Sequence, residues 1–162
     1  MNESLATVAE YLRLGIETDT LPLSVPRRWA DQVIADAPLA PGDIVEVAWS
    51  RDLPTLVAAL GSVEGERDFE LAERWFLRTL LSQLASGRQP AEVIRAAKHA
   101  LFASHLGREI YFEATVLEDD LRLAELGYVG SPAEAAEKFA NFLEAYAADS
   151  VPPALHDQPS GA

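Results

Sequence analysis

Apolar residues recur at helical spacing along almost the whole chain, and this periodicity limits the possible folds more than any other feature. The clearest run spans residues 66–86, where Phe69, Phe76 and Leu80 fall on one side of a helix, and Gly87 follows as a helix-ending residue. Similar runs follow one another, and no strand-like alternation is long enough for a sheet. The sequence therefore predicts an all-α protein, either an irregular multi-helix bundle or a short stack of helical hairpins.

Capping residues place the starts of several predicted helices. Ser4 can cap a first helix, and Asp52 or Leu53 starts another. Pro90 opens a helix that we expect to run to Gly107. The sequence Ser131-Pro132-Ala133-Glu134 is a capping box with proline at the first helical position, which predicts a helix in the last part of the chain.

Two segments, residues 43–50 and 109–117, remain open between helix and strand. Both contain β-branched or aromatic residues that favour strands, but both also fit a helix. We favour helix for residues 43–50 because the flanking segments are helical. After the second segment, Asp119 or Asp120 is expected to cap a short helix that ends at Leu126.

The length and composition predict one helical domain over residues 1–148 and a disordered tail over residues 149–162. The chain of 162 residues contains no cysteine, which excludes disulfides, thiolate metal sites and cysteine nucleophiles. Its N-terminus lacks the pattern of a secretory signal, and no apolar stretch approaches the length of a membrane span. A cytoplasmic location is therefore expected.

The formal net charge is −13, and the acidic residues concentrate toward both ends of the chain. Such a field repels nucleic acid and anionic membranes and attracts basic proteins. The sequence therefore predicts a protein partner with a basic surface, and neither nucleic acid nor membrane binding. Solubility alone is the simpler interpretation of the same charge.

Residues that could carry chemistry are few. His99 and His105 are six residues apart on one predicted helix, so they cannot bind one metal as an i, i+4 pair would. Glu66, Glu70 and Glu73 share a helix face, which fits either a carboxylate metal site or a solvated surface. We expect no catalytic residue, no metal ligand and no cofactor.

Several aromatic and charged residues are candidates for an interface. Phe102 and Leu106 lie among polar residues of one predicted helix, which indicates either a second buried layer or an interface anchor. The same choice applies to Trp49, and the acidic run at residues 118–120 fits either a helix cap or a contact with a basic partner. The predicted interface residues are Trp49, Arg95, Lys98, His99, Phe102, Leu106, Glu118, Asp119 and Asp120.

Two parts of the chain carry a family resemblance. The first comprises Trp29-Ala30-Asp31, Ile34 and Ile44-Val45-Glu46-Val47-Ala48; the second comprises Asp119-Asp120, Leu123-Ala124-Glu125, Gly127, Gly130, Ser131 and Pro132. With these features the chain resembles small bacterial all-helical proteins of unknown function, some of them similar to immunity proteins found beside secreted toxins. The resemblance implies a toxin-neutralising immunity protein and supplies no catalytic residues.

Three functions stay open at this point. The leading interpretation is a non-enzymatic cytoplasmic protein-binding module, specifically an immunity protein that neutralises a toxin. The first alternative is an enzyme with a metal or acid–base site built from carboxylates. The second is a helical scaffold or homo-oligomer that associates through Phe102, Leu106 and Trp49.

Overall fold

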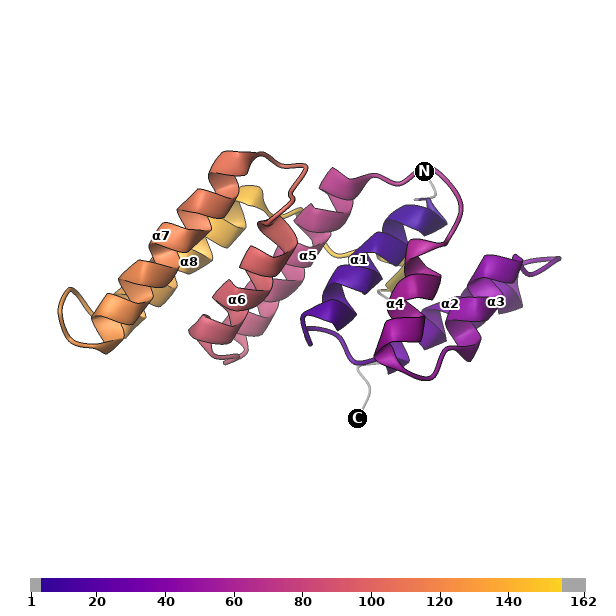
Figure 1. Ribbon diagram of the computed structural model, residues 1–162, viewed down its shortest axis with the longest axis horizontal. Coiled ribbons are helices and arrows are strands. Elements are labelled where there is room, and N and C mark those ends of the chain that lie inside the picture. Colours follow the sequence, from indigo (N-terminus) through magenta and orange to yellow (C-terminus); the bar gives the residue numbers. More distant parts are fainter. Residues whose placement is uncertain (1–3, 156–162) are drawn as a thin grey trace. The chain divides into compact units, whose positions relative to one another are not determined.

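The computed structural model describes residues 4–155 and confirms the all-α, multi-helix class. Within these residues there is no strand (Figure 1). The helices are α1 (Leu5–Glu17), α2 (Ser24–Asp36), α3 (Gly42–Trp49), α4 (Leu53–Gly61), α5 (Phe69–Ala85), α6 (Pro90–Leu101), α7 (Arg108–Glu125) and α8 (Pro132–Tyr146), followed by a 3₁₀ turn, η1 (Pro153–Leu155).

The described chain falls into two compact units. Unit 1 extends to Ala72 and resumes at Val151, and unit 2 extends from Glu73 to Ser150, so the division falls inside α5. The single domain expected over residues 1–148 stays a prediction.

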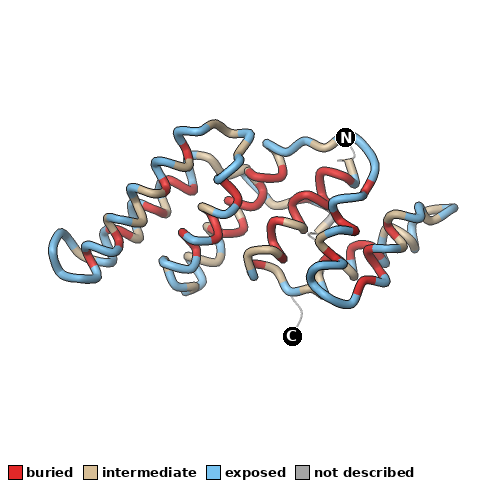
Figure 2. Tube along the Cα trace, in the orientation of Figure 1, coloured by how far each residue is buried: buried red, intermediate tan, exposed pale blue. Residues whose placement is uncertain are grey.

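In unit 1, α1 packs against α4, α2 packs against α3, and α3 also contacts α4. The apolar faces of these helices meet in a core that includes Leu12, Trp29, Ile44, Leu56 and Leu60, each at most 2% exposed. Figure 2 shows in red where buried residues recur along the helices. Residues 43–49 are helical, as favoured from the sequence, and Ser50 follows as the extended C-cap. Ile44 and Val47 both face the core at helical spacing.

Three of the predicted helix caps are confirmed, those of Ser4, Asp52 and Ser131. Ser4 Oγ accepts a hydrogen bond from the backbone N–H of Ala6 at 3.2 Å, and Asp52 Oδ1 accepts one from Thr55 at 3.0 Å. In unit 2, Ser131 Oγ accepts from the N–H of Glu134 at 3.2 Å. Each bond satisfies a donor that the first helical turn leaves unpaired.

In unit 2, α7 packs against both α6 and α8, and α7 and α8 lie side by side (Figure 1). Phe139 and Leu143 of α8 and Ile94 and Leu101 of α6 are at most 1% exposed. The end of α8 is tied to α5 by Arg78, whose Nε donates to the Ala148 carbonyl oxygen at 2.6 Å.

Helix α7 corrects one prediction. Residues 109–117 are helical, and Asp119 and Asp120 lie inside the same continuous helix rather than capping a new one. No glycine or proline interrupts the chain before Gly127, so nothing ends the helix at residue 118. Gly127 adopts a φ of +80°, and the N–H of Tyr128 then donates to the Leu123 carbonyl oxygen at 3.0 Å, which closes the helix.

Helix α6 corrects another prediction, because it ends at Leu101 rather than at Gly107. The residues after it form a loop that the buried carboxylate of Glu73 holds. Glu73 Oε2 accepts from Ser104 Oγ at 2.7 Å, and Glu73 Oε1 accepts from the backbone N–H of His105 at 3.1 Å. A helical backbone would use that N–H internally, so this contact competes with the helix.

The tail predicted to be disordered from residue 149 is placed as far as Leu155. Pro152 is buried, and Pro153–Leu155 form η1. The rest of that prediction, on residues 156–162, lies outside the described residues. Across residues 4–155, no helix has both the length and the apolar character that a bilayer crossing requires.

Candidate functional site

Helix α7 is apolar on two opposite sides, and only one of them is covered. Ile110, Ala114, Leu121 and Ala124 are buried in unit 2. The opposite side is exposed, and Figure 2 shows exposed positions in blue along this helix. It carries Phe112, Val116, Leu123 and Leu126, which are 62%, 58%, 37% and 65% exposed. A helix with a second, uncovered apolar side has the pattern of a contact surface.

The exposed residues form a regular line that we call the α7 stripe: Phe112, Val116, Asp119, Leu123 and Leu126. Successive members are alternately four and three residues apart. This spacing is the a and d pattern of a heptad repeat, which keeps a line of side chains on one side of a helix. Asp119 is the only charged member, and its carboxylate lies 3.5 Å from Arg122 Nη2.

The two flanks of the α7 stripe carry opposite charges. Arg108 and Arg122 occupy one flank, and Glu113 and Asp120 occupy the other. These are the positions next to the seam that set partner choice in paired helices. The stripe therefore has an apolar centre, an acidic interruption and flanks of opposite sign.

An aromatic cluster lies at the N-terminal end of the stripe. The ring of Phe102, which is 77% exposed, meets the ring of Tyr111 edge-on at 5.6 Å, and Tyr111 contacts Phe112 at 6.0 Å. Lys98 Nζ lies 5.6 Å from the centre of the Tyr111 ring and 3.4 Å from Glu118 Oε1. Two predicted interface residues, Lys98 and Phe102, therefore contact Tyr111, and a third, Glu118, pairs with Lys98.

The other predicted interface residues lie apart from this cluster. Arg95 and His99 are exposed on α6, and Leu106 is half-buried in the loop that follows. Asp119 belongs to the α7 stripe and Asp120 to its acidic flank. Trp49 belongs to unit 1, where it is 75% exposed and lines an open groove of about 530 Å³ between α3 and α4.

The apolar members of the α7 stripe are the residues that sequence reasoning missed. Their heptad spacing was present in the sequence, but the helix break expected near residue 118 divided it into two short pieces. Had the helical alternative for residues 109–117 been preferred, the two pieces of the heptad pattern would have formed one continuous helix. Periodicity alone does not distinguish the covered from the uncovered side of a helix that is apolar on both.

A second polar arrangement in unit 2 centres on Glu73. Besides holding the loop backbone, Glu73 Oε1 lies 3.1 Å from Nδ1 of His105, whose side chain is 53% exposed. A carboxylate that orients an imidazole is a component of general acid–base sites, and it is equally a way to anchor a loop. Within residues 4–155, no group of three or more histidine and carboxylate side chains is placed to hold a metal ion.

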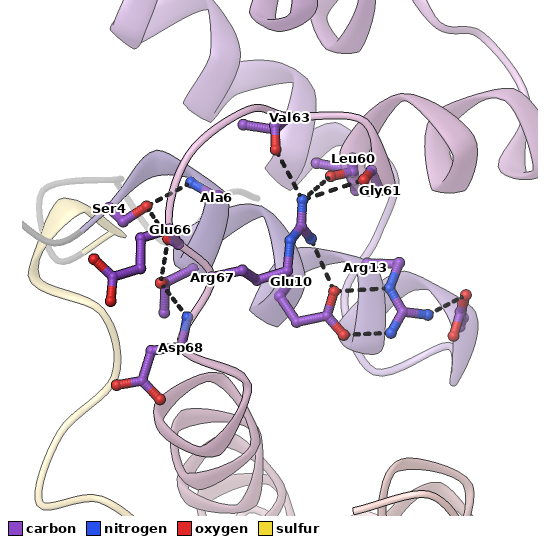
Figure 3. Close-up of polar contacts among 12 residues, drawn as sticks. Ser4, Ala6, Glu10, Arg13, Leu60, Gly61, Val63, Glu66, Arg67 and Asp68 are labelled. Carbon is purple, nitrogen blue, oxygen red and sulfur yellow. Dashed lines mark hydrogen bonds and ion pairs between the residues drawn. The ribbon is translucent and has the colours of Figure 1, made fainter. Parts of the chain in front are cut away.

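In unit 1, a buried ion-pair network joins Glu10 to two arginines (Figure 3). Arg13 pairs with Glu10 on the same helix, and Arg67 Nη1 donates to Glu10 Oε2 at 2.9 Å. Arg67 also donates to the carbonyl oxygens of Leu60 and Val63, at 3.1 and 3.0 Å. The network therefore fastens the segment after α4 to α1, which is a structural role.

The electrostatics of this network favour the charged form of Glu10. Burial raises the pKa of Glu10, but the hydrogen bonds and charges of Arg13 and Arg67 outweigh it and hold the pKa below its ordinary value. The hydrogen bond to Glu10 in turn raises the pKa of Arg13. Glu10 and Arg13 are therefore both charged near neutral pH.

Comparisons with known proteins add no relative: no family model matches the chain, and neither a curated protein nor a solved structure matches it.

Proposed function

We propose that this chain is a protein-binding module whose partner packs on the α7 stripe. The observation that carries the proposal is the exposure of Phe112, Val116, Leu123 and Leu126 along one side of a helix whose other side is buried. Leaving these side chains in water forgoes the free energy that burial would release, roughly 25 cal/mol for each Å² of apolar surface. A partner that covers the stripe recovers that free energy.

The charge of the chain supports a basic partner. With a net charge of −13, the protein attracts cationic surfaces over long distances and speeds their association. Toxins that act on nucleic acid need such surfaces. As the specific form of this function, we propose a toxin-neutralising immunity protein, which the acidic charge and the sequence resemblance support.

One observation favours the enzyme alternative. The contact between Glu73 and Nδ1 of His105 gives the imidazole an oriented acid partner, which the sequence did not reveal. A thermal-shift screen of small molecules on the wild type and on His105→Gln tests this second candidate. A ligand that stabilises only the wild type would support it, and equal shifts in both proteins would contradict it.

The main proposal is tested by capturing partners from the host lysate with tagged wild type, Phe112→Ser and Leu39→Ser. Leu39 is the matched control because it is 87% exposed and lies outside the α7 stripe. We expect Phe112→Ser to reduce recovery of the partner roughly tenfold or more, since buried aromatic anchors dominate interface free energies. Leu39→Ser should recover it like the wild type. Equal recovery by all three proteins would contradict the proposal.

A further inference from the structure

We infer that the α7 stripe binds an amphipathic helix of another protein, and that this helix places a lysine or arginine opposite Asp119. The inference rests on the proposed function and specifies the class of partner. It follows from the spacing of the stripe, from the charges around it and from the poor fit of a second copy of this chain.

The shape of the stripe fits a helix. Its members alternate four and three residues apart from Phe112 to Leu126, so they form a nearly straight seam of about 21 Å at 1.5 Å per residue. In seams of this spacing, the side chains of a second helix pack into the spaces between the side chains of the first. An amphipathic partner helix that lays its apolar side on the stripe would bury all four large apolar residues together.

The charges of the stripe define the partner further. Asp119 interrupts the apolar seam, and its side chain is 59% exposed beside Arg122. A helix that covers this position removes water from the carboxylate, which favours a cation on the partner. Acidic residues opposite Arg108 and Arg122, and basic residues opposite Glu113 and Asp120, would complete the match.

A second copy of this chain fits these charges poorly. In a parallel pair of α7 helices, Asp119 meets its own equivalent in the seam. In an antiparallel pair, the acidic flank with Glu113 and Asp120 meets the same acidic flank, and the arginine flank meets itself. Both arrangements bring like charges together, which disfavours them. The observations therefore favour a different protein as the source of the helix.

Two synthetic peptides of about 21 residues, three heptads, test the inference against the full chain. Both have leucine at the seam positions and flanks complementary to the stripe, and they differ only in a lysine or a glutamate facing Asp119. Fluorescence anisotropy measures their binding to wild type, Asp119→Lys and Phe112→Ser, with far-UV circular dichroism to confirm folding. We expect the wild type to bind the lysine peptide roughly fivefold more tightly, and Asp119→Lys to prefer the glutamate peptide.

Phe112→Ser should weaken the binding of both peptides, because it removes a large apolar side chain from the seam. Equal affinity for the two peptides, or the same preference in Asp119→Lys as in the wild type, would overturn the inference. So would light scattering that shows a dimer of the wild type and a monomer of Phe112→Ser, because a second copy would then occupy the stripe. If the lysate partner depends on Phe112 but the peptides show no preference, the proposed function stands and this inference fails.

Discussion

Glu10 shows how one buried charge ties stability to pH. Its carboxylate is paired with Arg13 and Arg67, and these partners lower its pKa. A carboxyl group with a lowered pKa in the folded state stabilises that state above its unfolded pKa, and the contribution disappears as pH falls through the folded pKa. We predict that Glu10→Gln lowers the free energy of unfolding by about 2–3 kcal/mol at pH 7.

Urea denaturation at pH 7 and at acidic pH checks this prediction. The difference between wild type and Glu10→Gln should shrink as pH falls from 4.5, the ordinary value for glutamate, toward the lowered pKa of the folded state, because the unfolded wild type binds a proton before the folded one does. Glu64→Gln, at an exposed position, is the matched control and should follow the wild type. A difference for Glu10→Gln that is independent of pH would contradict this account of the network.

Gly15 is required for a close approach within unit 1. A Cβ at this position would lie 2.4 Å from Leu21 Cδ1 and 3.1 Å from Leu21 Cβ, and the latter atom cannot move without its backbone. We predict that Gly15→Ala destabilises the protein by about 1–3 kcal/mol through overpacking, as measured by thermal denaturation.

Gly61→Ala is the control for that experiment, because a Cβ there has nothing within 4 Å. It should be neutral or slightly stabilising, since alanine favours the helical backbone more than glycine does. The same loss of stability in both variants would show that close packing is not the reason for glycine at position 15.

At the level of elements, helix α8 depends on its capping residue. Ser131 Oγ accepts from the N–H of Glu134 at 3.2 Å, and Pro132 occupies the first helical position. We predict that Ser131→Ala lowers stability by about 1 kcal/mol. Ser82→Ala on the exposed side of α5 should leave chemical denaturation unchanged. A loss for Ser131→Ala no larger than for this control would show that the cap contributes nothing measurable.

The elements also show how much of the fold could be predicted from sequence. The starts of α1, α4 and α8 were predictable because a local side chain caps each one. The end of α6 was not, because Glu73, far away in the sequence, holds the following loop. For the candidate site, the sequence pointed to Phe102, Lys98, Glu118 and Asp119. It did not point to the apolar members of the α7 stripe, since their exposure depends on which side of α7 the other helices cover.

At the level of the whole molecule, the acidic charge should affect how fast the partner arrives. We predict that association with the captured partner slows as salt concentration rises, because salt screens the attraction. Reversing the charges of Glu118, Asp119 and Asp120 to lysine should slow association and weaken its dependence on salt. Stopped-flow kinetics at low and high salt measures both effects. Unchanged kinetics would show that these acidic residues do not contribute to association.

Photo-crosslinking can establish whether the exposed side of α7 contacts a partner. A photoreactive amino acid replaces Val116, at the centre of the stripe, or Leu39 as the exposed control. Each tagged protein is then irradiated in the host lysate, and its adducts are identified by mass spectrometry. We expect one dominant protein adduct from position 116, which is lost when Phe112→Ser is added, and none of that species from position 39. The same adducts from both positions, or none from position 116 that depends on Phe112, would contradict it.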